Sequence, residues 1–354
     1  MFSSWPSYLL SLLPLITLTT ALPQHRSTSP SNAVRTIYEF PNETWIENIA
    51  IRSNGNLLLT LISTPSLYEL NPFNPSSKAQ LLHSFPASTS LLGISEIQPD
   101  IFAVIAGNWS TTTFTTTNGS YSVWKVDLNP NAKVKIDKIA EIREASFLNG
   151  MTLLAPSSPY LLISDSGLGV VWRLNYLTGE YKIILDSPLM KPVAGQLLLG
   201  INGIRILPGT NLIYFTNSFQ YLLARVPVYL SGPLAGSASG NYSVVASTGF
   251  ADDFTFDSQG NAYVTQDPGD ALEVVSQEGE VKVLVGSESS TIVEGDTADA
   301  FGRTEEDRGT LYVVTNGGIA GLVNGTRIVG GKVLAVDVEA LEARWRGEKK
   351  RVWI

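Results

Sequence analysis

The sequence contains no cysteine and only two histidines in 354 residues. Without cysteine there can be no disulfide and no thiolate nucleophile, so the stability of the fold must come from a large hydrophobic core. One histidine, His25, lies near the N-terminus, far along the chain from His83. This scarcity argues against a Ser/His/Asp catalytic triad and against a zinc site built from histidines.

Charged residues are also few, at 16% of the chain, and the formal net charge is −8. A nucleic-acid surface needs a clustered basic face, and the one basic cluster, RWRGEKKR at 344–351, falls in a predicted C-terminal tail over 343–354. The sequence also lacks a P-loop and a G-x-G-x-x-G motif that opens a helix. A small molecule is therefore the expected partner, without nucleic acid, and the oligomeric state stays open.

The N-terminal apolar run is shorter than the roughly 20 residues that span a bilayer. This run, over 8–18, is followed by small residues up to Ala21, which is typical of a signal peptide over 1–21 and disfavours a stable membrane anchor. Residues 22–32 are expected to form a disordered leader. A protein that is secreted or lies in the lumen of the secretory pathway is expected, in agreement with five glycosylation sequons. These sequons begin at Asn42, Asn108, Asn118, Asn241 and Asn324.

One short sequence motif recurs along the chain. Each copy has a first residue that varies, then small and apolar residues in alternation, and then a turn such as SNGN at 53–56. Six repeats with period-two alternation predict an all-β fold, a six-bladed β-propeller with four-stranded blades over 33–342. The N-terminal strand at 33–40 is expected to join 330–338 and close the last blade. The copies, 45–57 residues apart, begin at Glu47, Leu92, Asn149, Asn202, Asp252 and about Thr297.

The first residue of each copy of the motif is the candidate functional residue. In a propeller the positions that begin the innermost strands converge at the mouth of the central channel. Glu47 and Asp252 supply carboxylates there, and Asn149 and Asn202 supply carboxamides, all hard oxygen donors that suit Ca²⁺ or Mg²⁺. Because Asn-Gly is also the commonest hairpin dipeptide, the alternative is that Asn149 and Asn202 belong to structural turns.

The phrases ENIAIRSNG, FLNGM, GINGIRIL and ADDFTFDSQGNAYVT resemble the gluconolactonase and regucalcin family of six-bladed propellers. The resemblance covers about 33–338 and implies that Glu47, Asn149, Asn202 and Asp252 surround a divalent metal ion. The chain departs from the family in two places, because the usual EGP is here ENI and the sixth repeat has drifted.

The secretory, cysteine-free character of the chain is similar to a fungal secreted branch of this family, the hetero-Diels–Alderases of tropolone-sesquiterpenoid biosynthesis. The resemblance implies a pericyclase of secondary metabolism that joins a tropolone o-quinone methide to a humulene-type alkene, forming a dihydropyran meroterpenoid. Such a reaction requires no cofactor, although the ring of Glu47, Asn149, Asn202 and Asp252, the expected catalytic set, suits Ca²⁺ or Mg²⁺. Substrate-binding residues are expected at Leu92, Asn108, Phe219, Tyr221 and Asp267, with Trp109 on the same or a neighbouring rim.

Two other functions fit the same pattern. The first is a divalent-metal-dependent lactonase or esterase of the gluconolactonase type, in which the cation polarises a carbonyl and activates water. The second is a non-catalytic secreted propeller that binds a small molecule, favoured by the drifted sixth repeat. Propellers host all of these functions, so the fold does not decide between them.

Overall fold

The computed structural model describes residues 33–129, 134–288, 290–322 and 328–343. The predicted signal peptide (1–21), the predicted leader (22–32), the sequon at Asn324 and the predicted tail beyond residue 343 lie outside these residues. Of the other sequon asparagines, Asn42, Asn118 and Asn241 are exposed and Asn108 is half-buried. Glycosylation at these sites stays a prediction.

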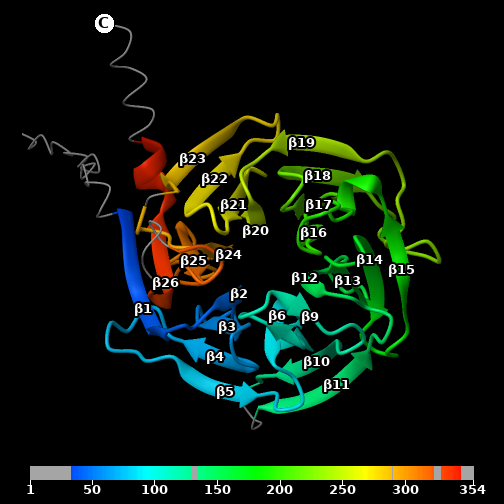
Figure 1. Cartoon of the computed structure of the whole chain (residues 1–354), viewed down its shortest axis with the longest axis horizontal. Helices are drawn as coiled ribbons and strands as arrows, with labels where there is room; N and C mark the ends of the chain where they lie inside the picture. Colours follow the sequence, from blue (N-terminus) through cyan, green and yellow to red (C-terminus); the bar gives the residue numbers. More distant parts are fainter. Residues whose placement is uncertain (1–32, 130–133, 289, 323–327, 344–354) are drawn as a thin grey trace, which may run out of the picture.

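Six antiparallel sheets of four strands surround a central axis, as Figure 1 shows. The prediction of an all-β, six-bladed propeller is therefore confirmed. The first blade contains β2 (Ile46–Ile51), β3 (Leu57–Leu61), β4 (Ser66–Leu70) and β5 (Gln80–Ser84). The second contains β6 (Ser90–Gln98), β7 (Ile101–Gly107), β10 (Ser122–Asp127) and β11 (Lys135–Glu141). The third contains β12 (Leu148–Leu153), β13 (Tyr160–Asp165), β14 (Val170–Asn175) and β15 (Tyr181–Asp186).

The remaining blades continue this pattern around the ring. The fourth contains β16 (Ile201–Ile206), β17 (Leu212–Asn217), β18 (Leu222–Pro227) and β19 (Ser243–Ser247). The fifth contains β20 (Ala251–Phe256), β21 (Ala262–Gln266), β22 (Ala271–Val275) and β23 (Val281–Gly286). The sixth contains β24 (Asp296–Phe301), β25 (Thr310–Thr315), β26 (Gly330–Asp337) and β1 (Val34–Asn42).

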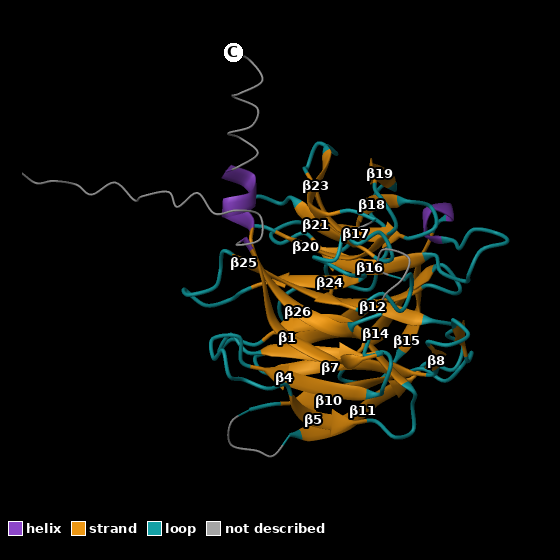
Figure 2. Cartoon of the chain, turned by 60° about the vertical axis from the view of Figure 1, so that its left-hand side comes forward, coloured by secondary structure: helices purple, strands orange, loops and turns teal. Residues whose placement is uncertain are grey.

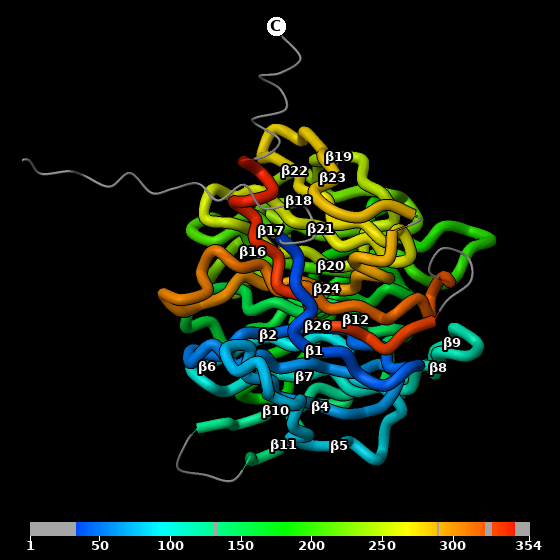
Figure 3. Tube along the Cα trace, turned by 90° about the vertical axis from the view of Figure 1, so that its left-hand side faces the viewer, coloured from blue at the N-terminus to red at the C-terminus, as the bar shows by residue number. Residues whose placement is uncertain are grey.

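The N-terminal strand closes the ring, as predicted. Strand β1 pairs antiparallel with β26 and forms the outer edge of the sixth blade, and Figure 3 shows the two strands side by side. Because β26 lies near the end of the described chain, this pairing joins the two ends of the propeller in one sheet. The N-terminal strand thus completes the sixth blade, and the ring is closed between the sixth blade and the first.

Hydrophobic side chains hold the blades against one another. Because strand residues alternate between two faces, each buried blade can present apolar side chains to both neighbours. The result is six apolar clusters, such as the one in which Leu162 of the third blade packs with Ile204 and Phe215 of the fourth. These clusters replace the disulfides that the sequence excludes.

Elements outside the blades are short. Within the residues that the structure describes, Figure 2 shows helix at η1 (Pro188–Met190) and at residues 338–343. None of the helices in the described part of the chain is long and apolar enough to cross a membrane. One insertion matters for the site: between β7 and β10 the second blade carries a small hairpin of β8 (Trp109–Ser110) and β9 (Thr115–Thr116).

Candidate functional site

A β-bulge near the start of each inner strand fixes the positions that the repeat marks. In every inner strand the pairing with the next strand slips at this point, for example between Ile201 and Ile204 of β16. A bulge re-aims its residue away from the ladder, and here it does so six times around one axis. The bulged positions include Glu47, Leu92, Asn149, Asn202, Asp252 and Thr297. Asn149 and Asn202 therefore lie within strands, and the alternative that they belong to hairpin turns is wrong.

Buried hydroxyl groups bind the bulged backbone of one blade to that of the next. A bulge leaves peptide groups without ladder partners, and buried peptide groups need partners. Thr216 Oγ1 accepts a hydrogen bond from Gly203 N at 2.9 Å and donates to Asp252 O at 2.5 Å. Ser164 Oγ likewise accepts from Gly150 N and donates to Asn202 O. These hydroxyls hold neighbouring inner strands in register, so the site residues are positioned by rigid blades and not by loops.

The Asn-Gly pairs have glycine because the adjacent inner strand passes directly over them. A Cβ atom on Gly203 would lie 2.8 Å from Asp253 Cα and 3.0 Å from Asp252 O. A Cβ atom on Gly150 would lie 2.7 Å from Asn202 O. Glycine is required here for close approach of two backbones.

Replacing Gly203 by alanine is expected to destabilise the fold by about 1–3 kcal/mol, because the added methyl group meets backbone atoms that cannot rotate away. Urea unfolding followed by tryptophan fluorescence measures this effect. The matched control is Gly309→Ala, since no heavy atom lies within 4 Å of a Cβ atom at that position. Equal unfolding midpoints for the two variants would contradict the close-packing explanation.

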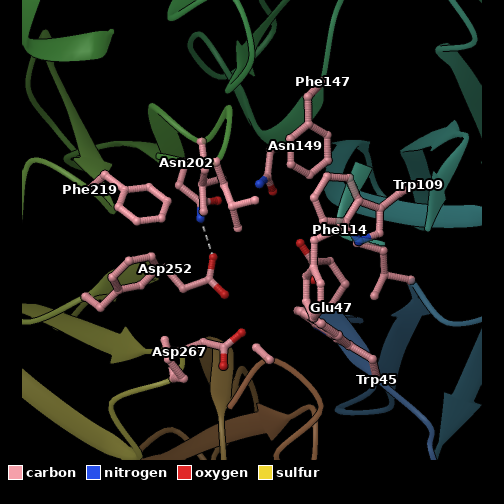
Figure 4. Close-up of a pocket in the computed structure, with 16 residues that line it drawn as sticks. Trp45, Glu47, Trp109, Phe114, Phe147, Asn149, Asn202, Phe219, Asp252 and Asp267 are labelled. Atoms are coloured by element: carbon pink, nitrogen blue, oxygen red, sulfur yellow. Dashed lines mark hydrogen bonds between the residues drawn. The ribbon is translucent and has the colours of Figure 1, made fainter. Parts of the chain in front are cut away.

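One cavity of about 320 Å³ lies where the bulged residues converge. Its polar side chains come from four inner strands and one loop, and Figure 4 shows them gathered at the centre: Glu47, Asn149, Asn202, Asp252 and Asp267. We call these five residues the polar floor. The remaining lining is almost wholly apolar and mostly aromatic or aliphatic: Trp45, Ile62, Trp109, Phe114, Phe147, Leu197, Leu199, Phe219, Phe250, Pro268 and Ala320. We call these residues the apolar wall.

The structure brings six of the predicted site residues to this cavity and leaves three outside it. Phe219 and Asp267 line it together with the four bulged polar residues. Leu92 holds the equivalent bulged position, but it is wholly buried in the core and does not line the cavity. Asn108 also does not line it, and its Oδ1 accepts from Thr89 N. Tyr221 is 49% exposed and packs against Phe250 outside the lining.

Four aromatic residues of the wall were not predicted, Trp45, Phe114, Phe147 and Phe250, although the sequence carries a signal for three of them. Trp45, Phe147 and Phe250 each precede a residue of the polar floor by two positions. The repeat therefore encodes an aromatic residue together with its polar one in three of the six copies. Others, such as Leu197 and Pro268, come from connecting loops in which nothing repeats.

Burial of several carboxyl groups raises their pKa values. Burial, strengthened by the charge of Asp267, raises the pKa of Glu47 to about 8. Burial also raises the pKa of Asp267 to about 7, although the neighbouring Asn316 side chain lowers it. For Asp252, burial and then the charge of Glu47 hold the pKa well above its usual range. The floor therefore retains protons near neutral pH unless a positive charge occupies it.

Asp253, which follows Asp252 directly, has a different role. It does not line the cavity, and Arg205 Nη2 lies 2.5 Å from its Oδ2 in a largely buried ion pair. The Asn48 side-chain amide donates to the same oxygen at 2.9 Å. Asp253 is thus neutralised and hydrogen-bonded, which leaves Asp252 as the aspartate that faces a ligand.

The polar floor fits a divalent cation. Asn202 Nδ2 donates to Asp252 Oδ1 at 2.6 Å and to Ser218 Oγ at 3.1 Å, so the orientation of the amide is fixed (Figure 4). Asn202 Oδ1 is consequently buried without a hydrogen-bond partner. An orphaned amide oxygen beside clustered carboxyl groups is suited to a hard cation. Within the described ranges, no three Asp, Glu, His or Cys side chains are arranged to hold a metal ion, so the amides would be needed.

No protein-family model matches the chain. A Phoma sp. protein provisionally named a hetero-Diels-Alderase is 27% identical over 348 residues, covering 87% of this chain and 95% of the relative. A Sarocladium schorii protein, provisionally named hetero-Diels-Alderase asR5, is 27% identical over 311 residues, covering 79% of this chain and 77% of the relative.

Solved structures share the fold. A luciferin-regenerating enzyme matches with a TM-score of 0.60 and 17% identity, covering 86% of this chain and 94% of that one. Regucalcin of Agrobacterium tumefaciens, described as a calcium-binding protein, matches with a TM-score of 0.58 and 16% identity, covering 86% and 95%. A gluconolactonase of Xanthomonas campestris matches with a TM-score of 0.55 and 13% identity, covering 88% and 93%. The chain is therefore a six-bladed β-propeller with the fold of the gluconolactonase and regucalcin proteins. Within that class, its curated sequence relatives are the proteins named hetero-Diels-Alderases, which confirms the resemblance seen in the sequence.

Proposed function

We propose that the chain is a hetero-Diels-Alderase that joins a tropolone o-quinone methide to the alkene of a humulene-type sesquiterpene. The observation that carries this proposal is a single cavity with an oxygen-rich floor and an aromatic wall. A tropolone ring is rich in adjacent oxygens and a sesquiterpene is a hydrocarbon, so the two partners match the two surfaces. The names of the two curated relatives support hetero-Diels-Alderase activity.

The residues would act mainly by positioning. In the cycloaddition, the four π electrons of the O=C–C=C unit and two of the alkene form one C–O and one C–C bond, and no proton is transferred. Holding the reacting atoms in contact is worth up to about 7–11 kcal/mol in favourable intramolecular comparisons. Asn149 and Asn202 would orient the ring oxygens that do not react. Carboxyl groups that keep their protons, such as Glu47, would donate hydrogen bonds to those oxygens.

We further propose that the floor holds Ca²⁺ or Mg²⁺ through Glu47, Asn149, Asn202 and Asp252. The orphaned Asn202 Oδ1 and the mutual repulsion of the carboxyl groups support this occupancy. When bound, such a cation would polarise substrate oxygens and neutralise the floor. The cycloaddition proposal does not depend on it.

A metal-dependent lactonase or esterase is the second candidate. The observation that favours it is the donor set itself, because two carboxylates and two carboxamides are more than a cycloaddition requires. The apolar wall disfavours it, because polar lactones of the gluconolactone type gain little from aromatic burial. A non-catalytic binding propeller would keep the cavity and catalyse neither reaction.

One experiment separates the three functions. Purified protein is incubated with humulenol and a hydroxymethyl tropolone, which gives the quinone methide by loss of water, and separately with a panel of lactones, each with Ca²⁺, with Mg²⁺ and with EDTA. We expect dihydropyran formation well above the protein-free rate, with one stereoisomer in excess, and no lactone hydrolysis. Hydrolysis without cycloaddition would establish the lactonase, and tropolone binding without either reaction would establish the binding protein.

We also propose that the protein enters the secretory pathway. The N-terminal 1–21 pattern and the exposed sequon asparagines support this localisation. A mass decrease on treatment of the native protein with an endoglycosidase tests it, and the mass of an unmodified chain beginning at Met1 would contradict it.

A further inference from the structure

The indole N–H of Trp109 is a hydrogen-bond donor without an acceptor. Four tryptophans lie in the described part of the chain. The two outside the cavity are satisfied, because Trp124 Nε1 donates to Ser122 Oγ at 2.9 Å and Trp172 Nε1 donates to Asp165 Oδ2 at 3.1 Å. The two that line the cavity, Trp45 and Trp109, have buried Nε1 atoms without a partner. Buried donors rarely stay unpaired, so this contrast needs an explanation.

The two cavity tryptophans have different surroundings. Trp45 lies beside Glu47 in the cavity and lowers the pKa of that carboxyl, so the polar floor itself offers an acceptor close to this indole (Figure 4). The Trp109 ring lies in the apolar wall, stacked on Phe147 with ring centroids 4.4 Å apart and an interplanar angle of 5°. Its other ring neighbour is the edge of Phe114. The ring neighbours of Trp109 are aromatic side chains, so they offer its indole N–H no oxygen or nitrogen acceptor.

Trp109 is held rigidly. Thr89 Oγ1 accepts from Trp109 N at 3.1 Å, and the Thr89 and Ser90 hydroxyls both lie within hydrogen-bond distance of Trp109 O. This residue opens the β8–β9 hairpin, an insertion that the other blades do not carry among the described strands. A donor fixed by its backbone and by stacking needs no reorganisation when an acceptor arrives. Such a device is typical of recognition and not of packing alone.

We infer that Trp109 Nε1–H donates a hydrogen bond to the reacting carbonyl oxygen of the heterodiene; this inference rests on the proposed function. The oxygen that forms the new C–O bond must face the alkene, and the alkene belongs against the apolar wall. A donor there withdraws electron density from the O=C–C=C unit and makes it a better acceptor for the electron-rich alkene. Because the indole is neutral and keeps its proton, it assists the reaction without protonating the oxygen.

The first test is kinetic. Trp109→Phe keeps an aromatic ring but removes the N–H, so we expect kcat for dihydropyran formation to fall about 2- to 10-fold, the effect of one neutral hydrogen bond. The matched control is Trp124→Phe, whose indole lies outside the cavity and should leave kcat unchanged. Unchanged kcat in Trp109→Phe, with wild-type cycloaddition, would overturn the inference.

The second test does not use turnover. In ¹⁵N–¹H spectra, addition of tropolone should shift the Trp109 indole resonance downfield and leave those of Trp124 and Trp172 in place, with Trp109→Phe providing the assignment. A shift in a protein that forms no dihydropyran would refute the proposed function and keep the donor. Absence of a shift at saturating tropolone would refute the donor even if the wild-type protein catalyses cycloaddition.

Discussion

Replacing Asp252 by alanine is expected to reduce dihydropyran formation about 100-fold, comparable to the loss of one preorganised polar group from an active site. Asp252 is the acceptor that fixes the Asn202 amide, through the 2.6 Å bond from Nδ2. Without it the amide keeps only the 3.1 Å hydrogen bond to Ser218 Oγ, and its orientation is less firmly fixed. One substitution therefore removes Asp252 from the polar floor and loosens Asn202 as well. Product formation from the tropolone and humulenol, measured by chromatography at saturating substrate, checks this expectation.

Two further variants show whether Asp252 acts through its hydrogen bond or through its charge. Asp252→Asn keeps an oxygen that can accept from Asn202 but loses the negative charge. If hydrogen bonding is the role, Asp252→Asn retains most of the activity, and if charge is the role, it is as impaired as alanine. Asp137→Asn is the control, because that carboxylate is exposed and pairs with Lys125 and Lys135 far from the cavity lining. Full activity in Asp252→Ala would refute the assignment of the floor to catalysis.

The blades could be predicted from the sequence because each blade has to meet the same packing requirements. A strand pair with a buried face needs alternation, and a bulge that lies directly under a neighbouring backbone needs a glycine, as at Gly150 and Gly203. The alternation recurs at each copy, whereas the glycine recurs in three of the six copies, at Gly93, Gly150 and Gly203. The β8–β9 hairpin occurs once and leaves no periodic trace. Its only sign is that the step from Leu92 to Asn149 is the longest in the repeat.

In the candidate site, too, residues at repeated strand positions could be predicted, and residues from loops or from contacts between blades mostly could not. Glu47, Asn149, Asn202 and Asp252 could be aligned because all begin inner strands, and the structure places all four on one cavity. Leu92 aligned equally well and does not line it, since equivalence of backbone position does not fix which side chains reach the opening. Asn108, Phe219, Tyr221 and Asp267 were predicted because they follow inner strands, and only Phe219 and Asp267 line the cavity. In a connecting loop, where nothing repeats, the sequence does not determine which way a side chain points. Whether the Trp109 indole N–H finds an acceptor depends on its packing against residues of another repeat, such as Phe147. The sequence of one repeat carries no information on such contacts.

The buried carboxyl groups should make stability depend on pH. In the unfolded chain these groups titrate near 3.8 for aspartate and 4.5 for glutamate, but in the fold Glu47 holds its proton to about pH 8 and Asp267 to about pH 7. Between these limits the folded state binds more protons than the unfolded state. The stabilisation is therefore complete below about pH 4 and is lost as pH rises toward 8, at about 1.4 kcal/mol per pH unit for each proton.

Thermal unfolding in EDTA should thus give a Tm that falls steadily from pH 5 to pH 8. Glu47→Gln removes the carboxyl group whose pKa burial raises to about 8 and should flatten the slope, whereas Asp137→Asn, on an exposed carboxylate, should not. At pH 8 a cation that binds the ionised floor should restore stability by about 2.7 kcal/mol at 100 times its Kd. A Tm independent of pH would contradict the raised pKa values. A pH-dependent Tm that neither Ca²⁺ nor Mg²⁺ changes would instead leave the carboxyl groups protonated and working as hydrogen-bond donors, because only a bound cation can favour their ionised form.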